Sequence, residues 1–219
     1  YRLALDGTAL LWRGDFQNAR QLVQALARRI DHKGSRAKRA KTKVAPTLLE
    51  SFHRHRLAQL QRARTLAMLL IPFEADYSIP LRRAPEVRQA CNEAYGAASE
   101  PFVVSLRELL GLIGAHEWRS KGVPIAALDD RIHPWYGVFS PVRGEYVELV
   151  AQAPLPKKTG LAFDIGAGTG VLSAVLARRG LRRVVATDMD ARAQGCAREN
   201  IERLGLSSQV EIIQADLFP

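Results

Sequence analysis

Between residues 161 and 214, short apolar runs alternate with longer amphipathic runs, and this alternation constrains the fold more than any other feature of the sequence. The strand-like runs are residues 161–165, 183–188 and 210–214, and the runs with apolar side chains at helical spacing are residues 171–179 and 191–204. The order strand, helix, strand, helix, strand predicts a parallel sheet with right-handed crossover connections.

A glycine-rich segment, Asp-Ile-Gly-Ala-Gly-Thr-Gly at residues 164–170, joins the first of these strands to the first helix. Gly166 and Gly168 let the backbone turn tightly and come close to a ligand. In the dinucleotide fingerprint, Gly-x-Gly-x-x-Gly, the amides of the helix face a pyrophosphate. Here the spacing is Gly-x-Gly-x-Gly, and the carboxylate of Asp164 would repel a pyrophosphate. A ligand with a positively charged amino group suits this position better.

Two further acids follow the next two strands. Asp188 ends the strand at 183–188, where a carboxylate accepts hydrogen bonds from ribose hydroxyls, and Asp216 follows the strand at 210–214. Each feature alone has a structural explanation: a tight turn for the glycines, a helix N-cap for Asp188, a turn for Asp216. Together with Asp164 they fall at the C-terminal ends of three adjacent strands, the edge at which open α/β sheets bind ligands.

With these motifs, residues 161–219 resemble the first half of a class I S-adenosylmethionine-dependent methyltransferase domain. More narrowly they resemble the small-domain methyltransferases, which include protein-glutamine N5-methyltransferases of release factors and guanine-N2 methyltransferases of ribosomal RNA. The resemblance implies S-adenosylmethionine as the cofactor. It assigns the methionine part to Asp164, Gly166, Gly168, Thr169 and Gly170, the ribose to Asp188, adenine packing to Met189, and the adenine amine to Asp216 with Leu217 beside it.

The resemblance extends upstream to residues 136–145, which are similar to the segment before the glycine strand in the glutamine methyltransferases. In that family a hairpin delivers an Ile-Pro-Arg-Pro-like stretch over the cofactor. Ser-Pro-Val-Arg at residues 140–143 keeps one proline and the arginine but lacks the second proline. The resemblance therefore implies substrate-side roles for Phe139, Pro141 and Arg143.

The reactive motif of the family, Asn-Pro-Pro-Tyr or similar after the fourth strand, does not occur in this sequence. In the family this motif holds a planar nitrogen in line with the methyl group, so that catalysis depends mainly on proximity and orientation. We therefore expect the sequence to be a fragment that stops before its catalytic residues, and we assign no catalytic residue within it. We also expect an incomplete sheet, with one edge bare.

The sequence as a whole predicts an α/β chain: a helical N-terminal domain and a hairpin, followed by the first half of a Rossmann-like methyltransferase domain. The predicted divisions are a basic helical domain at residues 1–115, a hairpin and linker at 116–152, and the cofactor-binding half at 153–219. Helices are expected at residues 16–30, 47–70, 86–95, 103–113 and 145–151, and an exposed, mobile loop at 31–43.

The net charge of +10 comes entirely from the N-terminal end, because residues 1–64 hold 15 Lys and Arg against four acids. Such asymmetry indicates contact with a polyanion. No apolar run is long enough to span a bilayer, and the two cysteines have no metal-ligand spacing, so neither a membrane nor a metal is expected. A reducing cytoplasm fits this composition best.

The leading hypothesis is a methyltransferase whose full-length form methylates a nitrogen, either of a protein glutamine or of an RNA base. The basic N-terminal region favours a ribosome-linked or RNA acceptor. Two alternatives remain open: a non-catalytic RNA-binding protein that keeps a methyltransferase shell, and a nicotinamide-dependent oxidoreductase, against which the glycine spacing and Asp164 argue.

Overall fold

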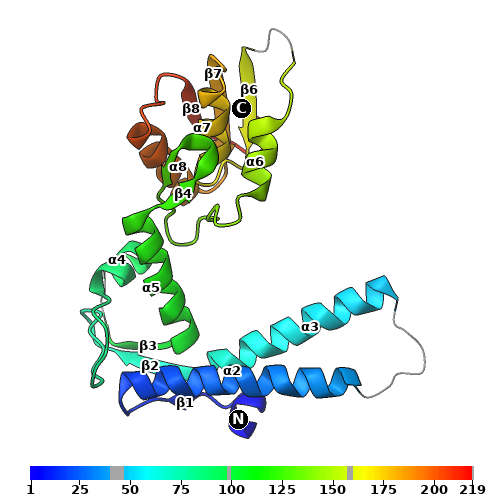
Figure 1. Ribbon diagram of the computed structural model, residues 1–219. Helices are drawn as coiled ribbons and strands as arrows, with labels where there is room; N and C mark the ends of the chain where they lie inside the picture. Colours follow the sequence, from blue (N-terminus) through cyan, green and yellow to red (C-terminus); the bar gives the residue numbers. More distant parts are fainter. Residues whose placement is uncertain (40–46, 98–99, 157–159, 219) are drawn as a thin grey trace. The chain divides into compact units, whose positions relative to one another are not determined.

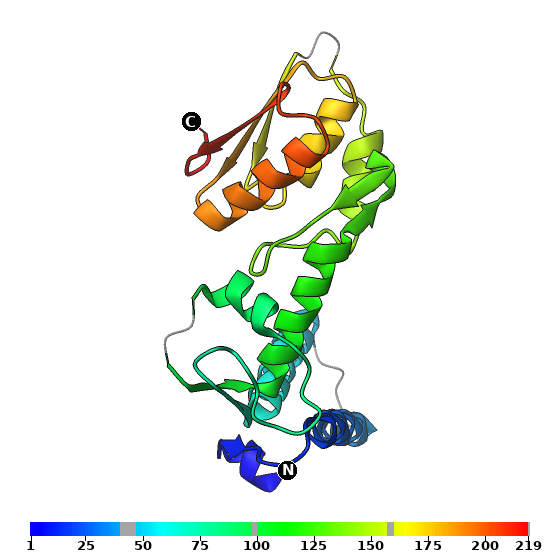
Figure 2. The same ribbon diagram turned by 90° about the vertical axis from the view of Figure 1, so that its left-hand side faces the viewer.

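The computed structural model describes residues 1–39, 47–97, 100–156 and 160–218, and it divides into two compact units, Tyr1–Ile113 and Gly114–Pro219 (Figures 1 and 2). The predicted hairpin and the predicted cofactor-binding half fall in the same unit, since the helix at 145–152 packs against the helix at 171–178. The division of the chain at residues 115 and 152 stays a prediction. Within the described ranges, no helix has both the length and the apolar character needed to cross a membrane.

Five helices lie wholly or partly in the first unit among the residues described. They are α1 (Arg2–Leu5), α2 (Phe16–Arg39), α3 (Leu48–Ala67), α4 (Arg88–Tyr95) and α5 (Leu106–Lys121), the last of which runs on into the second unit. Thr47 caps α3 as predicted, because its side chain accepts a hydrogen bond from the backbone of Glu50 while the Glu50 carboxylate accepts one from the backbone N–H of Thr47.

The predicted mobile loop is wrong over residues 31–39, because α2 continues to Arg39; residues 40–43 lie outside the described residues. Arginine, lysine and alanine are good helix formers even where they bury no face, which explains the longer helix. An ion pair joins α2 to α3: Arg62 Nε of α3 lies 2.9 Å from Asp31 Oδ1 of α2. The two helices lie side by side along part of their length (Figure 1).

The first unit also contains a three-stranded sheet that the sequence analysis does not predict. Its strands are β1 (Leu10–Leu11), β2 (Leu69–Phe73) and β3 (Phe102–Ser105), with β2 central, parallel to β1 and antiparallel to β3. The ends of two predicted helices are therefore wrong: the helix expected at 47–70 stops at Ala67, and the start of the one at 103–113 is strand. Short apolar runs fit either element equally well, so periodicity cannot separate them.

The second unit confirms the predicted element order. A hairpin of β4 (Val123–Ile125) and β5 (Asp130–Ile132) is followed by α6 (Glu145–Gln152), and then by a parallel sheet in the order β6-β7-β8. The sheet and its crossovers are β6 (Leu161–Ile165), α7 (Val171–Arg178), β7 (Arg183–Asp188), α8 (Ala191–Arg203) and β8 (Val210–Gln214).

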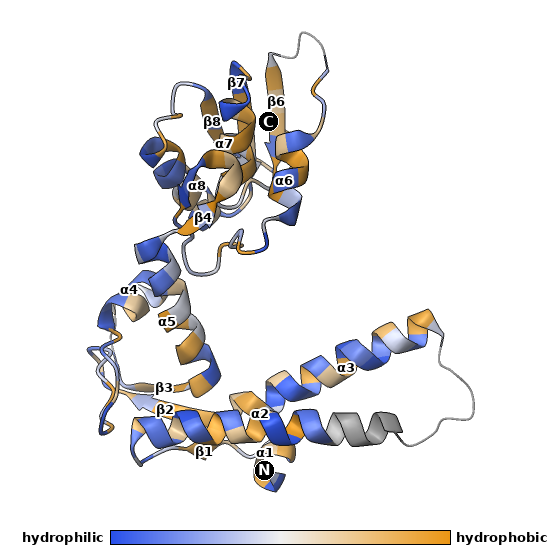
Figure 3. Cartoon of the chain, in the orientation of Figure 1, coloured by the Kyte–Doolittle hydropathy of each residue, from blue (hydrophilic) through white to orange (hydrophobic). Residues whose placement is uncertain are grey.

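Helices α7 and α8 cover the same face of this sheet (Figure 2), and the strongly hydrophobic α7 and β7 form the centre of the unit (Figure 3). Val175 of α7 and Val184 of β7 are almost completely buried there. Burial of such side chains stabilises the unit by about 1.5–3 kcal/mol each. On the edge strand β6, Leu161 and Phe163 are each 43% exposed, and the Phe163 ring meets that of Phe218 at 5.4 Å.

Candidate functional site

The glycine segment forms a loop between β6 and α7, with all three glycines in the left-handed region. Their φ angles are 75° at Gly166, 56° at Gly168 and 77° at Gly170. The backbone N–H groups of Gly166 and Ala167 both donate to the carbonyl of Thr187, at 2.8 and 2.9 Å. The loop is thereby fastened to the C-terminal end of β7.

The three glycines serve two different purposes. A Cβ atom at Gly166 would meet nothing within 4 Å, and one at Gly168 would meet only the carbonyl of Gly166 at 4.0 Å, so this side of the loop is open to a ligand. A Cβ at Gly170 would lie 3.3 Å from the Cβ of Ala197 on α8. Gly166 and Gly168 thus leave room above the loop, and Gly170 lets α7 approach α8.

Replacing Gly170 by alanine is expected to destabilise the protein by about 2–3 kcal/mol, because left-handed backbone costs a residue with a Cβ about 1–2 kcal/mol and the methyl group crowds Ala197. Gly180 is the matched control, since it has a φ of 91° and open space around it, so Gly180→Ala adds strain without crowding. Urea unfolding measures both. Equal losses for the two variants would contradict the packing role of Gly170.

Asp188 lies at the end of β7 and holds two backbone groups. Its Oδ2 accepts a hydrogen bond from the N–H of Gly168 at 3.0 Å, and its Oδ1 accepts one from the N–H of Asp190 at 3.0 Å. A carboxylate oxygen accepts more than one hydrogen bond, so both oxygens retain acceptor capacity toward a ligand. The side chain of Met189, next in sequence, is 65% exposed.

Asp164 lies deeper, below the glycine loop, and is 8% exposed. Its Oδ2 accepts a hydrogen bond from the Ser173 hydroxyl of α7 at 2.6 Å. Burial, and to a smaller extent the negative charge of Asp188, raise the pKa of Asp164, while the hydrogen bonds from Ser173 act in the opposite direction. A buried carboxylate with a raised pKa is stabilised in its ionised form by a nearby cation.

The segment after β8 comes to the same edge of the sheet. The Thr187 hydroxyl donates to the carbonyl of Leu217 at 2.6 Å, and the N–H of Ala215 donates to the carbonyl of Asp188 at 3.3 Å. Leu217 has a φ of 71° and, like Asp216, an exposed side chain. The structure thus places the predicted residues after all three strands along one edge, with Thr169 buried in the loop.

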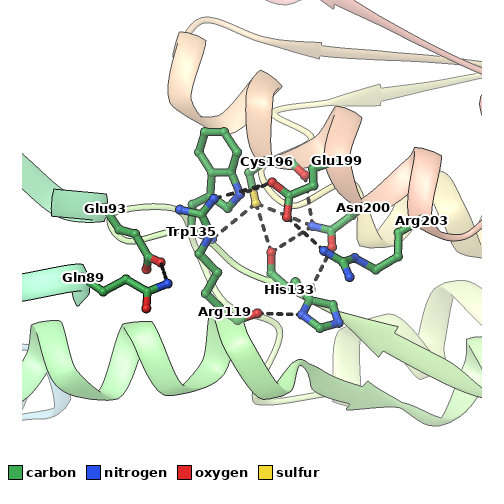
Figure 4. A network of polar contacts seen from close by, with 9 residues as sticks. All are labelled: Gln89, Glu93, Arg119, His133, Trp135, Cys196, Glu199, Asn200 and Arg203. Carbon is green, nitrogen blue, oxygen red and sulfur yellow. Dashed lines mark hydrogen bonds and ion pairs between the residues drawn. The ribbon is translucent and has the colours of Figure 1, made fainter. Parts of the chain in front are cut away.

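Upstream, Trp135 fastens the segment that follows β5 to α8 (Figure 4). Its backbone N–H meets the Cys196 sulfur at 3.4 Å, and its indole N–H donates to Glu199 at 3.1 Å. The Arg119 guanidinium lies 4.7 Å from the ring centroid. A Cβ atom at Gly195 would lie 3.0 Å from the indole, so the missing side chain makes room for the ring.

Asn200 of α8 is the fully buried centre of this network (Figure 4). Its Oδ1 accepts from the backbone N–H of His133 at 2.8 Å, and its Nδ2 donates toward the carbonyls of His133 and Thr169, each at 3.2 Å. One side chain therefore joins the segment that follows β5 to the glycine loop. The sequence pattern predicts residue 200 only as part of a helix. An amide on the buried face of an amphipathic helix is the signal that could have identified it.

The three predicted substrate-side residues lie between β5 and α6. Phe139 is 72% exposed, Arg143 is exposed and Pro141 is buried. Arg192, in the first turn of α8, donates to the carbonyl of Tyr136 at 3.2 Å and so ties this segment to the helix that follows Asp188. Among the described side chains, the buried hydroxyl of Ser140 has no hydrogen-bond partner. Contact of Phe139, Pro141 and Arg143 with a substrate remains a prediction.

Cys196 is a packed side chain of α8. It is fully buried, and burial raises the pKa of its thiol to about 11, so the thiol is protonated at neutral pH. Over the ranges that the structure covers, no group of three or more His, Cys, Asp or Glu side chains has the arrangement of a metal site.

Comparison with known proteins gives one family match, which lies in the second unit. Residues 131–219 match the family model described as methyltransferase small domain. A ribosomal protein L11 methyltransferase of Pelotomaculum thermopropionicum is 43% identical over 59 residues, which are 27% of this chain and 19% of that protein. A tRNA1(Val) (adenine(37)-N6)-methyltransferase of Shewanella loihica is 38% identical over 78 residues, which are 36% of this chain and 32% of that protein.

Among solved structures, the Trypanosoma brucei PRMT1 enzyme-prozyme complex with AdoHcy is 35% identical, with a TM-score of 0.25, over 26% of this chain and 18% of that chain. The matches to the two curated relatives span 19% and 32% of those proteins' lengths.

Proposed function

We propose that the full-length protein transfers a methyl group from S-adenosylmethionine to a nitrogen atom, proceeding from the match of residues 131–219 to the methyltransferase small domain family. The observation that carries the proposal is the open, left-handed glycine loop, held by the carboxylate of Asp188 at the end of the neighbouring strand. A loop so placed fits a ligand that carries a ribose and an extended amino-acid part.

The residues at the sheet edge fit S-adenosylmethionine in both shape and charge. Open space at Gly166 and Gly168 accommodates the methionine part, and the spare acceptor capacity of Asp188 suits the two ribose hydroxyls. The exposed side chains of Met189 and Leu217 offer apolar surface to the adenine ring. Asp164 supplies the negative charge that a cationic ligand requires.

When bound, S-adenosylmethionine supplies a methyl group on a positively charged sulfur. The protein would hold the cofactor in place. The glycine loop would bind its methionine part, Asp188 would bind its ribose, and residues 139–143 would cover the substrate side. Correct orientation of the acceptor nitrogen toward the methyl group would be the main contribution to the rate.

Isothermal titration of the full-length protein with S-adenosylmethionine tests the proposal. We expect saturable binding of one cofactor per chain, and weaker binding of a nicotinamide dinucleotide, because Asp164 would repel a pyrophosphate. The absence of S-adenosylmethionine binding at millimolar concentration would overturn the proposal. Preferential binding of the dinucleotide would favour an oxidoreductase instead.

For the acceptor, we propose a nitrogen in a protein or RNA of the translation machinery. The names of the relatives support this class, since they methylate ribosomal protein L11 or a transfer RNA. The excess of 15 basic over four acidic residues in the first 64 residues favours an RNA-containing target. On α3, Arg54 and Arg56 are exposed beside His53 and His55.

RNA binding by the full-length protein should weaken steeply with salt, because each phosphate contact releases counterions. Fluorescence anisotropy with ribosomal or transfer RNA between 50 and about 200 mM salt measures the slope. Replacing Arg54 and Arg56 together by glutamine should flatten it. A slope that is flat in the unmodified protein would exclude RNA as the acceptor.

The variant Asp164→Asn is expected to lose cofactor affinity by about ten- to a hundredfold while keeping the fold, because a charge-assisted bond contributes about 1.5–3 kcal/mol. Since the folded-state pKa of Asp164 is raised, its burial destabilises the apo-protein increasingly as pH rises through that pKa. The variant should therefore melt at the same or a higher temperature at pH 7, and this gain should disappear at pH 3–4, near the ordinary pKa of Asp. Thermal melts at both pH values and titration calorimetry check this; unchanged affinity would contradict the role of Asp164.

A further inference from the structure

The first unit contains a hollow of about 420 Å³, and none of its lining residues belongs to the elements that form the methyltransferase site. The hollow is bounded by the end of α4, by β3 and by the first turn of α5. Its walls combine the aromatic rings of Tyr77, Tyr95 and Phe102 with the carboxylates of Glu100 and Glu108. Aromatic faces together with acidic side chains favour one kind of ligand, an organic cation.

The three aromatic side chains form a compact corner. The Phe102 ring lies 5.8 Å from that of Tyr77 and 6.2 Å from that of Tyr95, and it stands nearly perpendicular to both, at 86° and 85°. The rings of Tyr77 and Tyr95 are 6.3 Å apart. All three aromatic residues line the hollow, and aromatic rings bind methylated ammonium groups through their faces.

Hydrogen bonds hold the two tyrosine rings in place. The Tyr95 hydroxyl donates to Glu108 at 2.6 Å, and the Tyr77 hydroxyl donates to the carbonyl of Gly96 at 2.9 Å. Tyr77 also has left-handed backbone, with a φ of 65°, which is rare for so large a residue. Backbone strain of this kind persists where the surrounding structure requires it and is often found at ligand clamps.

The charge of the hollow is opposite to that of the surrounding sequence. Residues 1–64 of the same unit carry almost four times as many basic as acidic side chains, whereas this hollow presents Glu100 and Glu108. Both carboxylates repel anions such as phosphate. A primary ammonium group has three N–H donors that need acceptors, whereas each added methyl group removes one donor and a quaternary ammonium group has none. A largely aromatic wall therefore suits a highly methylated group better.

We propose that this hollow binds a methylated or quaternary ammonium group. The Tyr77, Tyr95 and Phe102 rings contact its methyl groups, and Glu100 and Glu108 balance its charge. Such a group can belong to a small molecule or to a methylated lysine side chain of a protein. The site lies outside the sheet edge assigned to S-adenosylmethionine, so the proposal is independent of the proposed activity.

The experiment titrates the full-length protein with choline, and separately with 3,3-dimethylbutanol, its uncharged isostere, by calorimetry and protein NMR. We expect choline to bind about tenfold more tightly, because cation–π attraction is lost in the neutral compound. Equal binding of the two, or no binding of choline, would overturn the proposal. A trimethyllysine peptide that binds more tightly than choline would identify a protein side chain as the source, and the reverse would identify a small molecule.

Two variants test the assignment at exposed lining residues. Tyr95→Ala removes an exposed ring, and Glu108→Gln removes one charge while keeping the shape; each should weaken choline binding by about threefold or more. Glu93→Gln is the matched control, because it removes the same charge from α4 at a residue outside the lining. Unchanged melting temperatures would show that the variants are folded. If Glu108→Gln and Glu93→Gln bind choline equally well, the Glu108 carboxylate does not take part in binding. If Tyr95→Ala binds choline as tightly as the unmodified protein, the Tyr95 ring does not take part.

Discussion

Replacing Asp188 by alanine is expected to weaken S-adenosylmethionine binding by at least a hundredfold. Two hydrogen bonds from ribose hydroxyls to a carboxylate contribute about 1.5–3 kcal/mol each, and both are lost. The variant also removes the acceptor that holds the N–H of Gly168, so the glycine loop loses one of its attachments to β7. Titration calorimetry with the full-length protein measures the affinity.

Asp190→Ala is the control for this experiment. Asp190 carries the same charge two residues away, but its side chain caps α8 by accepting from the N–H of Arg192 at 2.8 Å. Its loss should cost about 1 kcal/mol of stability and change cofactor affinity little. If Asp188→Ala binds the cofactor as well as Asp190→Ala does, the ribose assignment is wrong.

The variant Asn200→Ala is expected to lower the free energy of unfolding by about 3–5 kcal/mol. Alanine leaves the N–H of His133 and the carbonyls of Thr169 and His133 without their partner in a fully buried place. Each unsatisfied buried group costs about 1–3 kcal/mol, although relaxation and water recover part of the sum. Because Thr169 belongs to the glycine loop, cofactor affinity should fall as well.

Urea unfolding followed by tryptophan fluorescence measures this loss, with Arg203→Ala as the control on the same helix. Arg203 is exposed and pairs with Glu199 at 3.1 Å, so its removal should cost about 0–1 kcal/mol. Asn200→Asp keeps an acceptor for His133 but buries a charge and loses the donors, so it should be at least as unstable as the alanine variant. A loss below about 1 kcal/mol in Asn200→Ala would mean that other groups or water replace the amide.

The fold of the second unit is predictable from the sequence because each of its elements is complete within one local pattern. The strand at 161–165 ends in glycines, and the helices at 171–178 and 191–203 have clear apolar faces. The sheet of the first unit is not predictable in this way. Leu69–Phe73 follows a helix after a single residue, and β1 has only two residues, so no change of periodicity marks either strand.

Only some residues of the candidate site can be identified from the sequence. The glycines and Asp188 are recognisable because their spacing relative to strand ends is itself the signal. Asn200 and Trp135 are not, because their partners are far away in sequence: His133 and Asn200 are 67 positions apart, and Trp135 and Glu199 are 64 apart. Only the folded chain shows that a helical amide and a hairpin tryptophan support the loop.

The position of Trp135 gives the protein an optical reporter of its own. The indole is packed in the gap left by Gly195, with a guanidinium above it and a thiol near its backbone. The emission of Trp135 should therefore change when the segment that follows β5 separates from α8. The chain has three tryptophans, so a protein with phenylalanine at positions 12 and 118 would emit from this place alone. Movement of the substrate-side segment then becomes visible in stopped-flow experiments without any added label.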